Sequence, residues 1–407
     1  MLDLAPADAR LAAADPALPG LRDLLAPLGL VRRLAPGWGV REARVAYLRY
    51  KPGTSLLAGL VLTDDDGVTS FAQALALRAG SADKLAKVRR AGEADDVGRG
   101  AVVDGALGVA VGDVTADRRL PGVRRVLRDA DGVTPLVYRP GRRWVARIED
   151  GREPGELVRV YHPGRTGGVL AGHRALAGLP VPALTAVRRR RGTVRTAWVP
   201  GTSLDRLSGA EALWAQAGAL AAAVHREARD ERLDRVDRDA QLGASVSAVR
   251  AVAPASADAA QVAAERVRAG LAGRGVVSVV HGDLSADQLV VRPDVAAGTA
   301  PDAAAPGQAP LTLIDLDRVA LDDPLADLGS WYGALVATGA EAGDPARVLA
   351  PLLTGYTAAG GEVDERVLRL HCAAAVLQRA VEPFRRHRPD WFDGVARLVA
   401  VAEELTS

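Results

Sequence analysis

The sequence predicts an α+β protein in which short antiparallel strands dominate the first half and helices dominate the second. Between residues 45 and 77, short apolar runs alternate with turn signals such as Lys51-Pro52-Gly53, a pattern typical of hairpins. The stretch from residue 138 to 161 has the same texture. From residue 201 onward, apolar residues recur mostly at helical spacing. Sheets and helices are therefore expected in separate parts of the chain.

The composition is that of a folded globular protein. The chain has 407 residues, enough for two or three domains, and is 48% hydrophobic and 25% charged. Its 52 basic and 50 acidic residues give a formal net charge of +2, so no global field favours nucleic acid or an anionic membrane. The single cysteine, Cys372, excludes an internal disulfide and a thiolate metal cluster.

No targeting or membrane segment is predicted. The first residues lack a basic region followed by an apolar one, and no apolar run reaches the roughly 20 residues of a membrane helix. We therefore expect a cytoplasmic protein, either a monomer or a homodimer. The run Arg188-Arg189-Arg190-Arg191 has no interleaved aromatic residues, so it predicts a solvated hairpin tip rather than a nucleic-acid site.

Individual elements follow from periodicity and punctuation. Residues 2–34 contain leucines at roughly helical spacing, interrupted by prolines, and predict short helices. Alanine, proline, glycine and aspartate dominate residues 293–310, which predicts a mobile hairpin insertion. The remaining expected elements are strands at 45–50, 56–62, 71–77, 144–148, 157–161, 184–189 and 193–199, and helices at 166–179, 213–225 and within 331–405.

One short pattern occurs twice. Tyr50-Lys51-Pro52-Gly53 is echoed by Tyr138-Arg139-Pro140-Gly141, and each copy is followed by two strands. Two copies are too few for a solenoid, which needs at least three units. The pattern therefore predicts two separate small sheets.

Polar residues gather where apolar runs end in the second half. Val279-Val280 leads into His281-Gly282-Asp283, and a further apolar run follows Gln288. The run from Leu311 to Ile314 ends at Asp315, and Asp323-Pro324 is followed by Asp327. These offsets predict strand, loop and strand, with carboxylates at the strand ends.

Such a set matches what phosphoryl transfer requires. The reaction needs a carboxylate that orients the attacking hydroxyl, oxygen ligands for magnesium, and cations on the phosphates. Asp283 is placed to act on the hydroxyl, and Asp315 can hold the metal ion. Gln288, five residues after Asp283, can add an amide oxygen.

The linked motifs resemble the aminoglycoside phosphotransferase family. These motifs are His-Gly-Asp-Leu-x-x-x-Gln from residue 281, Ile-Asp-x-Asp from residue 314, and Asp-Pro-x-x-Asp-Leu from residue 323. The glutamine at position 288 and the presence of an N-terminal cap are also similar to bacterial maltokinases. The resemblance implies a bilobal protein-kinase-like fold, ATP and Mg²⁺ as cofactors, and a small-molecule hydroxyl as acceptor. The repeated pattern predicts an N-terminal cap with a small sheet over residues 1–130, and the resemblance implies a nucleotide-binding lobe over 131–200 and a helical lobe over 201–407.

The resemblance also assigns roles in the helical lobe. It makes Asp283 the catalytic aspartate and Asp315 a magnesium ligand, with Gln288 as the second ligand. His281, in the catalytic loop, and Asp327 would brace that loop, and His225 would pack beneath it.

Further roles concern the nucleotide. Trp198 and Val199 match the hinge whose backbone takes the adenine. Gly141 and Arg142 fall in the loop that covers the phosphates, and Arg159 in the third strand of the lobe would bind them.

Three positions depart from the family pattern. Gln288 stands where the family usually has asparagine, and Arg159 stands where a lysine is usual. The helix expected at 166–179 has no glutamate to pair with that cation. These departures leave open a pseudokinase-like module that binds a nucleotide or a partner without turnover.

The sequence does not distinguish among a sugar, an amino sugar and an aminoglycoside as the acceptor. Asp317, Asp322 and Asp323 lie close to the metal loop in sequence. They would suit a cationic aminoglycoside, or they are ordinary solvated acids.

Overall fold

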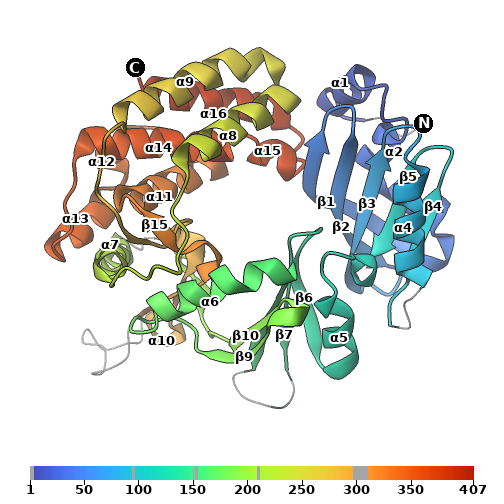
Figure 1. The fold of residues 1–407 in the computed structure, drawn as a ribbon, viewed down its shortest axis with the longest axis horizontal. Helices are drawn as coiled ribbons and strands as arrows, with labels where there is room; N and C mark the ends of the chain where they lie inside the picture. Colours follow the sequence, from blue (N-terminus) through green and yellow to red (C-terminus); the bar gives the residue numbers. More distant parts are fainter. Residues whose placement is uncertain (1–3, 94–96, 150, 152–154, 209–210, 297–309) are drawn as a thin grey trace. The chain divides into compact units, whose positions relative to one another are not determined.

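The computed structural model describes residues 4–93, 97–149, 151, 155–208, 211–296 and 310–407. The chain divides into two compact units. The first comprises Met1–Thr166, Thr185–Thr196 and Glu382–Gly394, and the second comprises Gly167–Leu184, Ala197–Val381 and Val395–Ser407. Antiparallel sheets dominate the first unit and helices the second, so the predicted α+β class is confirmed (Figure 1).

The first unit begins with short helices and a five-stranded sheet in the order β1-β2-β3-β5-β4. The predicted hairpin is confirmed, because Lys51 at the end of one strand pairs with Ser55 at the start of the next. The elements are α1 (Pro6–Ala14), α2 (Leu21–Leu25), α3 (Pro27–Leu34), β1 (Val40–Lys51), β2 (Ser55–Asp64), β3 (Thr69–Leu77), α4 (Ala82–Glu93), β4 (Ala101–Asp104) and β5 (Val109–Asp113).

A second five-stranded sheet has the order β6-β7-β8-β10-β9. Here Arg139, at the end of the first strand, pairs with Arg143 across the predicted turn. Arg143 also pairs with Tyr161, which lies at the end of the third strand. The elements are α5 (Gly122–Asp129), β6 (Val133–Arg139), β7 (Arg143–Ile148), β8 (Glu156–Tyr161), α6 (Thr166–Ala175), β9 (Leu184–Arg188) and β10 (Thr193–Ala197).

The two sheets are copies of one arrangement. Both have the first three strands in succession and the fifth strand between the third and the fourth, and a helix follows the third strand in each. The glycine before each fifth strand has the same left-handed backbone, with φ of 67° at Gly108 and 68° at Gly192. Each accepts a hydrogen bond from the last residue of the third strand, Leu77 at 2.9 Å and Tyr161 at 2.8 Å.

A longer repeat precedes the sheets. The pattern Ala-Asp-x-x-Leu-Pro-Gly occupies residues 14–20 and 116–122. In both copies the leucine N–H donates to the aspartate carbonyl, at 3.2 Å for Leu18 and 3.0 Å for Leu120. The Tyr-x-Pro-Gly pattern alone reveals only part of this duplication.

Helix α5 covers one face of the second sheet. Val123 and Val126 of the helix are buried in one cluster with Trp144, Ile148 and Val160 of the strands. Trp144 has no exposed surface. Truncating an aromatic side chain of this kind typically costs about 3–5 kcal/mol of stability.

A late segment of the chain also belongs to the first unit. It contains α15 (Glu382–Arg385) and the start of α16 (Trp391–Leu405). The buried carboxylate of Asp8 in α1 lies 2.9 Å from His387 Nε2 and accepts a hydrogen bond of 2.9 Å from the Trp391 indole N–H. The role of Trp391 in the fold is therefore to pack and to anchor α1.

The second unit is helical, with two small sheets in the orders β11-β13-β14 and β12-β15. Asp237 and Asp364 begin two of its helices by accepting a backbone N–H from the first turn. Its elements, besides α6 and most of α16, are β11 (Thr202–Ser203), α7 (Glu211–Arg226), α8 (Arg238–Val252), α9 (Ala257–Gly270), β12 (Ser278–Val280), β13 (Leu289–Val291), α10 (Pro293–Ala296), β14 (Leu311–Leu313), β15 (Ala320–Asp322), α11 (Leu325–Thr338), α12 (Pro345–Val348), α13 (Ala350–Ala358) and α14 (Glu365–Arg379).

Helices α11 and α14 approach closely. A Cβ atom at Gly329 would lie 2.6 Å from the carbonyl carbon of His371, and one at Gly333 would lie 2.8 Å from Ala375 Cβ. Any larger residue at these two positions of α11 would force the helices apart. The close packing fixes the polar side chains that both helices contribute to the loop after β12.

Several boundaries differ from the predictions. The helix expected to reach residue 179 ends at Ala175, and the chain then turns through Leu179 before two prolines. The strands expected to reach residues 189 and 199 end at Arg188 and Ala197. Of the predicted insertion, residues 297–309 lie outside the described residues, but the strands that flank it pair antiparallel. No described helix is both long and apolar enough to cross a membrane.

Candidate active site

The loop after β12 is held by one buried carboxylate. Asp327, in the first turn of α11, is 1% exposed. It accepts hydrogen bonds from the backbone N–H of His281 at 2.7 Å and of Gly282 at 2.8 Å. His225 Nε2 at the end of α7 lies 3.1 Å from the same carboxylate, and His225 Nδ1 lies 3.0 Å from the Tyr356 hydroxyl.

These contacts explain why Asp327 tolerates burial. Burial by itself would raise the pKa of the Asp327 carboxyl. The bonds from His225 and from the His281 backbone outweigh that effect and hold the pKa below its ordinary value. The carboxylate is therefore charged and fixes both the loop and His225.

His281 itself turns into the protein. Its side chain has no exposed surface, and Nε2 lies 2.9 Å from the carbonyl oxygen of Ile314. That carbonyl comes just after β14, so the His281 side chain joins the loop to the segment that carries Asp315. Gly282 adopts a left-handed backbone with φ of 79°, and a Cβ atom there would lie 2.2 Å from the Arg318 carbonyl oxygen. Glycine is required at this position.

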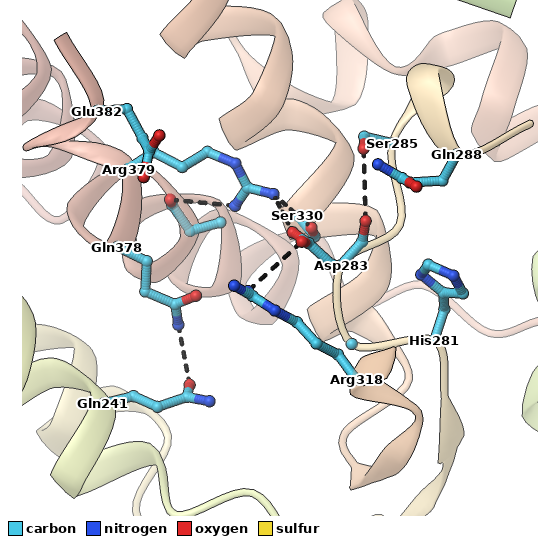
Figure 2. Close-up of polar contacts among 12 residues, drawn as sticks. Gln241, His281, Asp283, Ser285, Gln288, Arg318, Ser330, Gln378, Arg379 and Glu382 are labelled. Carbon is cyan, nitrogen blue, oxygen red and sulfur yellow. Dashed lines mark hydrogen bonds and ion pairs between the residues drawn. The ribbon is translucent and has the colours of Figure 1, made fainter. Parts of the chain in front are cut away.

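Asp283 lies between two guanidinium groups (Figure 2). Arg379 Nη2, from the end of α14, donates to Asp283 Oδ1 at 2.8 Å and to Ser330 Oγ at 2.9 Å. Arg318 Nη1 lies 3.5 Å from Asp283 Oδ2. Burial would raise the pKa of Asp283, but Arg318 and Arg379 outweigh it and hold the pKa below its ordinary value.

Gln288 and Asp315 are brought together by strand pairing. Leu289 pairs with Leu313, and the Ile314 N–H donates to the Gln288 carbonyl oxygen at 2.9 Å. Asp315 has a left-handed backbone with φ of 59°, an uncommon conformation for a residue with a side chain. Strained backbone of this kind concentrates at functional sites.

The Asp315 carboxylate and the Gln288 amide oxygen suit Mg²⁺ better than a metal ion whose ligands must all come from protein side chains. Mg²⁺ usually keeps several waters and takes one or two carboxylates together with substrate phosphates. Gln288 Nε2 donates to Asp287 at 3.0 Å, and no described residue engages the amide oxygen. Among the described residues, no three His, Cys, Asp or Glu side chains converge in the manner of a metal cage.

The hinge residues lie where the chain enters the second unit. β10 ends at Ala197, and Trp198 and Val199 follow in a half-buried segment outside any strand. Gly201 is pressed against β13, because a Cβ atom there would lie 2.1 Å from the Val291 carbonyl oxygen.

The expected phosphate-binding residues belong to the first unit. Gly141 and Arg142 lie in the turn between β6 and β7, where the Arg142 N–H donates to the Arg139 carbonyl oxygen at 2.9 Å. Arg159 lies on β8 opposite Val145 and is 7% exposed. A buried arginine with this little exposure is not a solvated surface residue.

Three residues of the site escaped prediction from the sequence. Ser330, Arg318 and Arg379 all surround Asp283, yet none belongs to the motifs that carry the resemblance. Arg379 does have a sequence signal, since it lies two residues after the apolar run Cys372-Ala373-Ala374-Ala375-Val376-Leu377 in a mostly buried helix. A cation at such a position needs a partner.

Comparison with known proteins shows similarity at the level of structure. No family model matches the sequence, and no curated protein matches it. A choline/ethanolamine kinase family protein from Mesorhizobium loti is 16% identical, with a TM-score of 0.50 over 72% of this chain and 97% of that chain. Choline kinase LicA from Streptococcus pneumoniae is 12% identical, with a TM-score of 0.51 over 69% of this chain and 96% of that chain.

A third similar structure is the GDP complex of aminoglycoside 2'-phosphotransferase-IIIa, at 15% identity and a TM-score of 0.48 over 70% of this chain and 99% of that chain. The fold of the chain is therefore the protein-kinase-like fold of small-molecule kinases. The match to the Mesorhizobium protein leaves more than a quarter of this chain outside it. The resemblance to maltokinases stays a prediction.

Proposed function

We propose that the protein is an ATP- and Mg²⁺-dependent phosphotransferase that acts on a hydroxyl of a small polar molecule. The observation that carries the proposal is that Asp283 and Gln288 share one loop and that the residue before Asp315 donates its backbone N–H to the Gln288 carbonyl oxygen at 2.9 Å. That loop is braced by Asp327 and joined through His281 to the segment that bears Asp315. The fold shared with small-molecule kinases supports the same conclusion.

Asp283 would orient the acceptor hydroxyl and accept its proton. The hydroxyl oxygen forms a bond to the terminal phosphorus, the bond from that phosphorus to the bridging oxygen breaks, and the nucleoside diphosphate leaves. The two guanidinium groups beside Asp283 keep its carboxylate charged, so it is ready to accept a hydrogen bond at neutral pH. Arg379 occupies one carboxylate oxygen at hydrogen-bond distance, whereas Arg318 is 3.5 Å from the other.

Asp315 and the Gln288 amide oxygen would hold Mg²⁺. The ion, when bound, neutralises charge on the phosphates. In the first unit, the Gly141 and Arg142 turn would cover the phosphates and Arg159 would bind them. The Trp198 and Val199 backbone would take the adenine.

A pseudokinase-like module is the second candidate, favoured by the residues of β8 and α6. Arg159 replaces the usual lysine, and no glutamate or aspartate occurs in α6. An arginine fork binds phosphate with a different geometry from that of an ammonium group. Mg-ATP would then bind without turnover.

The acids near the metal loop argue against a strongly cationic acceptor. Asp322 is bonded to Arg238, and Asp323 accepts from Arg274 at 2.7 Å. Both carboxylates are therefore already compensated. A sugar or an amino sugar fits these pairings better than a polycationic aminoglycoside does.

Turnover is tested by nucleoside diphosphate release with Mg-ATP and a panel of neutral sugars, amino sugars and aminoglycosides. We expect one class to stimulate release at least tenfold, and Asp283→Asn to abolish that stimulation. The matched control is Asp294→Asn, a partly exposed acid paired with Arg292. Mg-ATP binding measured by calorimetry, with no stimulation by any acceptor, would favour the pseudokinase-like module.

A further inference from the structure

The two sheets of the first unit carry the same side-chain clamp on the same turn. Asp15 Oδ2 accepts from the Tyr50 hydroxyl at 2.7 Å and from the Gly53 N–H at 2.8 Å. Asp117 Oδ2 accepts from the Tyr138 hydroxyl at 3.0 Å and from the Gly141 N–H at 2.6 Å. In each copy one buried carboxylate oxygen holds both ends of a Tyr-x-Pro-Gly turn.

The turns themselves are alike. In both, the residue after glycine donates to the carbonyl oxygen three residues before it, at 3.0 Å for Thr54 and 2.9 Å for Arg142. The glycines have φ of 62° at Gly53 and 66° at Gly141. Proline followed by such a glycine is the pattern of a type II turn, which does not follow the twist of the flanking strands. The hydrogen bonds to the aspartate carboxylate therefore help to stabilise each turn.

The surroundings of the two turns differ in charge. Arg49 of β1 has a pKa lowered by burial and by the neighbouring guanidiniums of Arg142 and Arg119. The second turn contains Arg139, Arg142 and Arg143 and has the side chain of Arg119 beside it, whereas the first turn contains Lys51 and is bonded to the backbone of Arg78.

The third strands of the two sheets also differ in charge, and again the second sheet carries the basic residue. The pair Leu57 and Leu75 in the first sheet occupies the register of the pair Val145 and Arg159 in the second, counted from the turn. Arg159 therefore has a leucine as its counterpart. The first copy keeps the clamp but has fewer basic residues in its turn and a leucine in place of Arg159.

We propose that Asp117 is a positioning residue for nucleotide binding, because it fixes the turn from Arg139 to Arg143 in the conformation that receives the phosphates. This inference rests on the proposed function, in which that turn covers the phosphates. Asp15 holds the corresponding turn of the first sheet, to which the proposed function assigns no phosphate. The duplication thus supplies an internal control for Asp117.

Asp117 holds the turn through Oδ2, and its Oδ1 accepts from the Arg119 N–H at 3.0 Å. Burial raises its pKa, against the lowering effect of the Gly141 and Arg119 N–H groups and the Tyr138 hydroxyl. An asparagine oxygen at the same place can accept both the Gly141 N–H and the Tyr138 hydroxyl. Asp117→Asn should therefore keep the two bonds that hold the turn, although its amide NH2 then replaces the oxygen that accepts from the Arg119 N–H. Asp117→Ala should release the turn.

The test compares Asp117→Ala with Asp15→Ala in the full chain, using the dissociation constant for Mg-ATP, the melting temperature and hydrogen exchange at the two turns. Both substitutions remove the bonds from a tyrosine hydroxyl and a glycine N–H, and Asp117→Ala also removes the bond of 3.0 Å from the Arg119 N–H to Oδ1. Asp117→Ala should therefore lower the melting temperature at least as much as Asp15→Ala. Asp117→Ala should also weaken Mg-ATP binding about tenfold and speed exchange at residues 139–143. Asp15→Ala should leave Mg-ATP binding within about twofold, and Asp117→Asn should restore it.

A second pair of less disruptive substitutions tests the same role if an alanine variant does not fold. Tyr138→Phe and Tyr50→Phe each remove one hydrogen bond of a clamp and keep the ring. Only Tyr138→Phe should weaken Mg-ATP binding, by about threefold. Equal effects of the two copies on binding would overturn the positioning role and leave the proposed function standing. A failure of the unchanged protein to bind Mg-ATP would overturn both.

Discussion

Arg379 Nη2 lies 2.8 Å from Asp283 Oδ1 and ties the last residue of α14 to the loop after β12. The same nitrogen donates to Ser330 Oγ in α11 at 2.9 Å. Three elements distant in sequence therefore meet at one guanidinium group (Figure 2). The bond restricts the rotation of the carboxylate and leaves Oδ2, next to Arg318, as the oxygen with the looser contact.

Removing Arg379 should impair turnover more than nucleotide binding. Arg379→Met keeps much of the length of the side chain but loses the bond to Asp283, so kcat should fall about tenfold to a hundredfold, with the KM for ATP changed less than about threefold. The acid limb of the pH profile of kcat should also move toward neutral pH, because the pKa of Asp283 rises when a neighbouring cation is lost.

The control for Arg379 lies on the same helix. Arg369 is half exposed and pairs with Asp344 at 3.0 Å. Arg369→Met should leave both kcat and the pH profile unchanged. A loss of kcat for Arg379→Met with no movement of the acid limb would mean that Arg379 serves only the packing of α14.

Asp327 should be the most costly single carboxylate to remove. Asp327→Ala leaves two buried backbone N–H groups and His225 without their hydrogen-bond acceptor. The free energy of unfolding, measured by urea denaturation, should therefore fall by about 3–5 kcal/mol. Asp344→Ala, which removes an exposed carboxylate from the same unit, should cost less than about 1 kcal/mol. Similar losses for the two variants would contradict a bracing role.

The motifs of the second half could be predicted from sequence because their spacing is local. His281, Asp283 and Gln288 share one loop, and Asp315 follows the strand that pairs with the end of that loop. Arg379 could not be placed in this way, since its contact with Asp283 depends on how closely α11 and α14 pack. That distance is set by glycines whose effect is visible only in three dimensions.

The duplication was recognisable only in part for a related reason. The Tyr-x-Pro-Gly pattern recurs, but the strands after it share few residues. What the copies share is backbone geometry, such as the left-handed glycines Gly108 and Gly192 and the order of the strands. A sheet tolerates many side chains on the same hydrogen-bond ladder, so sequence diverges faster than topology.

Arg159 decides between an active enzyme and a pseudokinase-like module. If the arginine fork binds phosphate, Arg159→Leu, which installs the residue of the first sheet, should raise the KM for ATP at least tenfold. Arg159→Lys should then change the KM by less than about threefold. In an inactive module whose defect is this one cation, Arg159→Lys should instead create measurable turnover.

Arg49 should contribute to nucleotide binding although it lies in the first sheet. Burial and the neighbouring guanidiniums of Arg142 and Arg119 lower the pKa of Arg49 and outweigh the opposite effect of Tyr47 and Asp117, so the three like charges repel one another. A phosphate would relieve that repulsion. Arg49→Gln should raise the KM for ATP about threefold to tenfold and should slightly stabilise the nucleotide-free protein in thermal denaturation. Arg44→Gln, an exposed change on the same strand, should do neither.

Asp323 should make the second unit sensitive to acid. Its carboxylate accepts from Arg274 at 2.7 Å and from the Leu325 N–H at 3.0 Å, and it lies 3.6 Å from His371. These contacts outweigh burial and lower the pKa of Asp323 to about 2, below the roughly 3.9 of an unfolded chain.

A carboxyl whose pKa is lower in the folded state stabilises the fold above its unfolded pKa and loses that effect as the pH falls through the folded value. Asp323 should therefore contribute about 2 kcal/mol at neutral pH, most of it lost between about pH 4 and pH 2. The measurement is urea denaturation of the unchanged protein and of Asp323→Asn across that range. The difference in unfolding free energy between the two should shrink toward acid pH, and a difference that stays constant from pH 6 to pH 2 would assign the contribution of Asp323 to packing rather than charge.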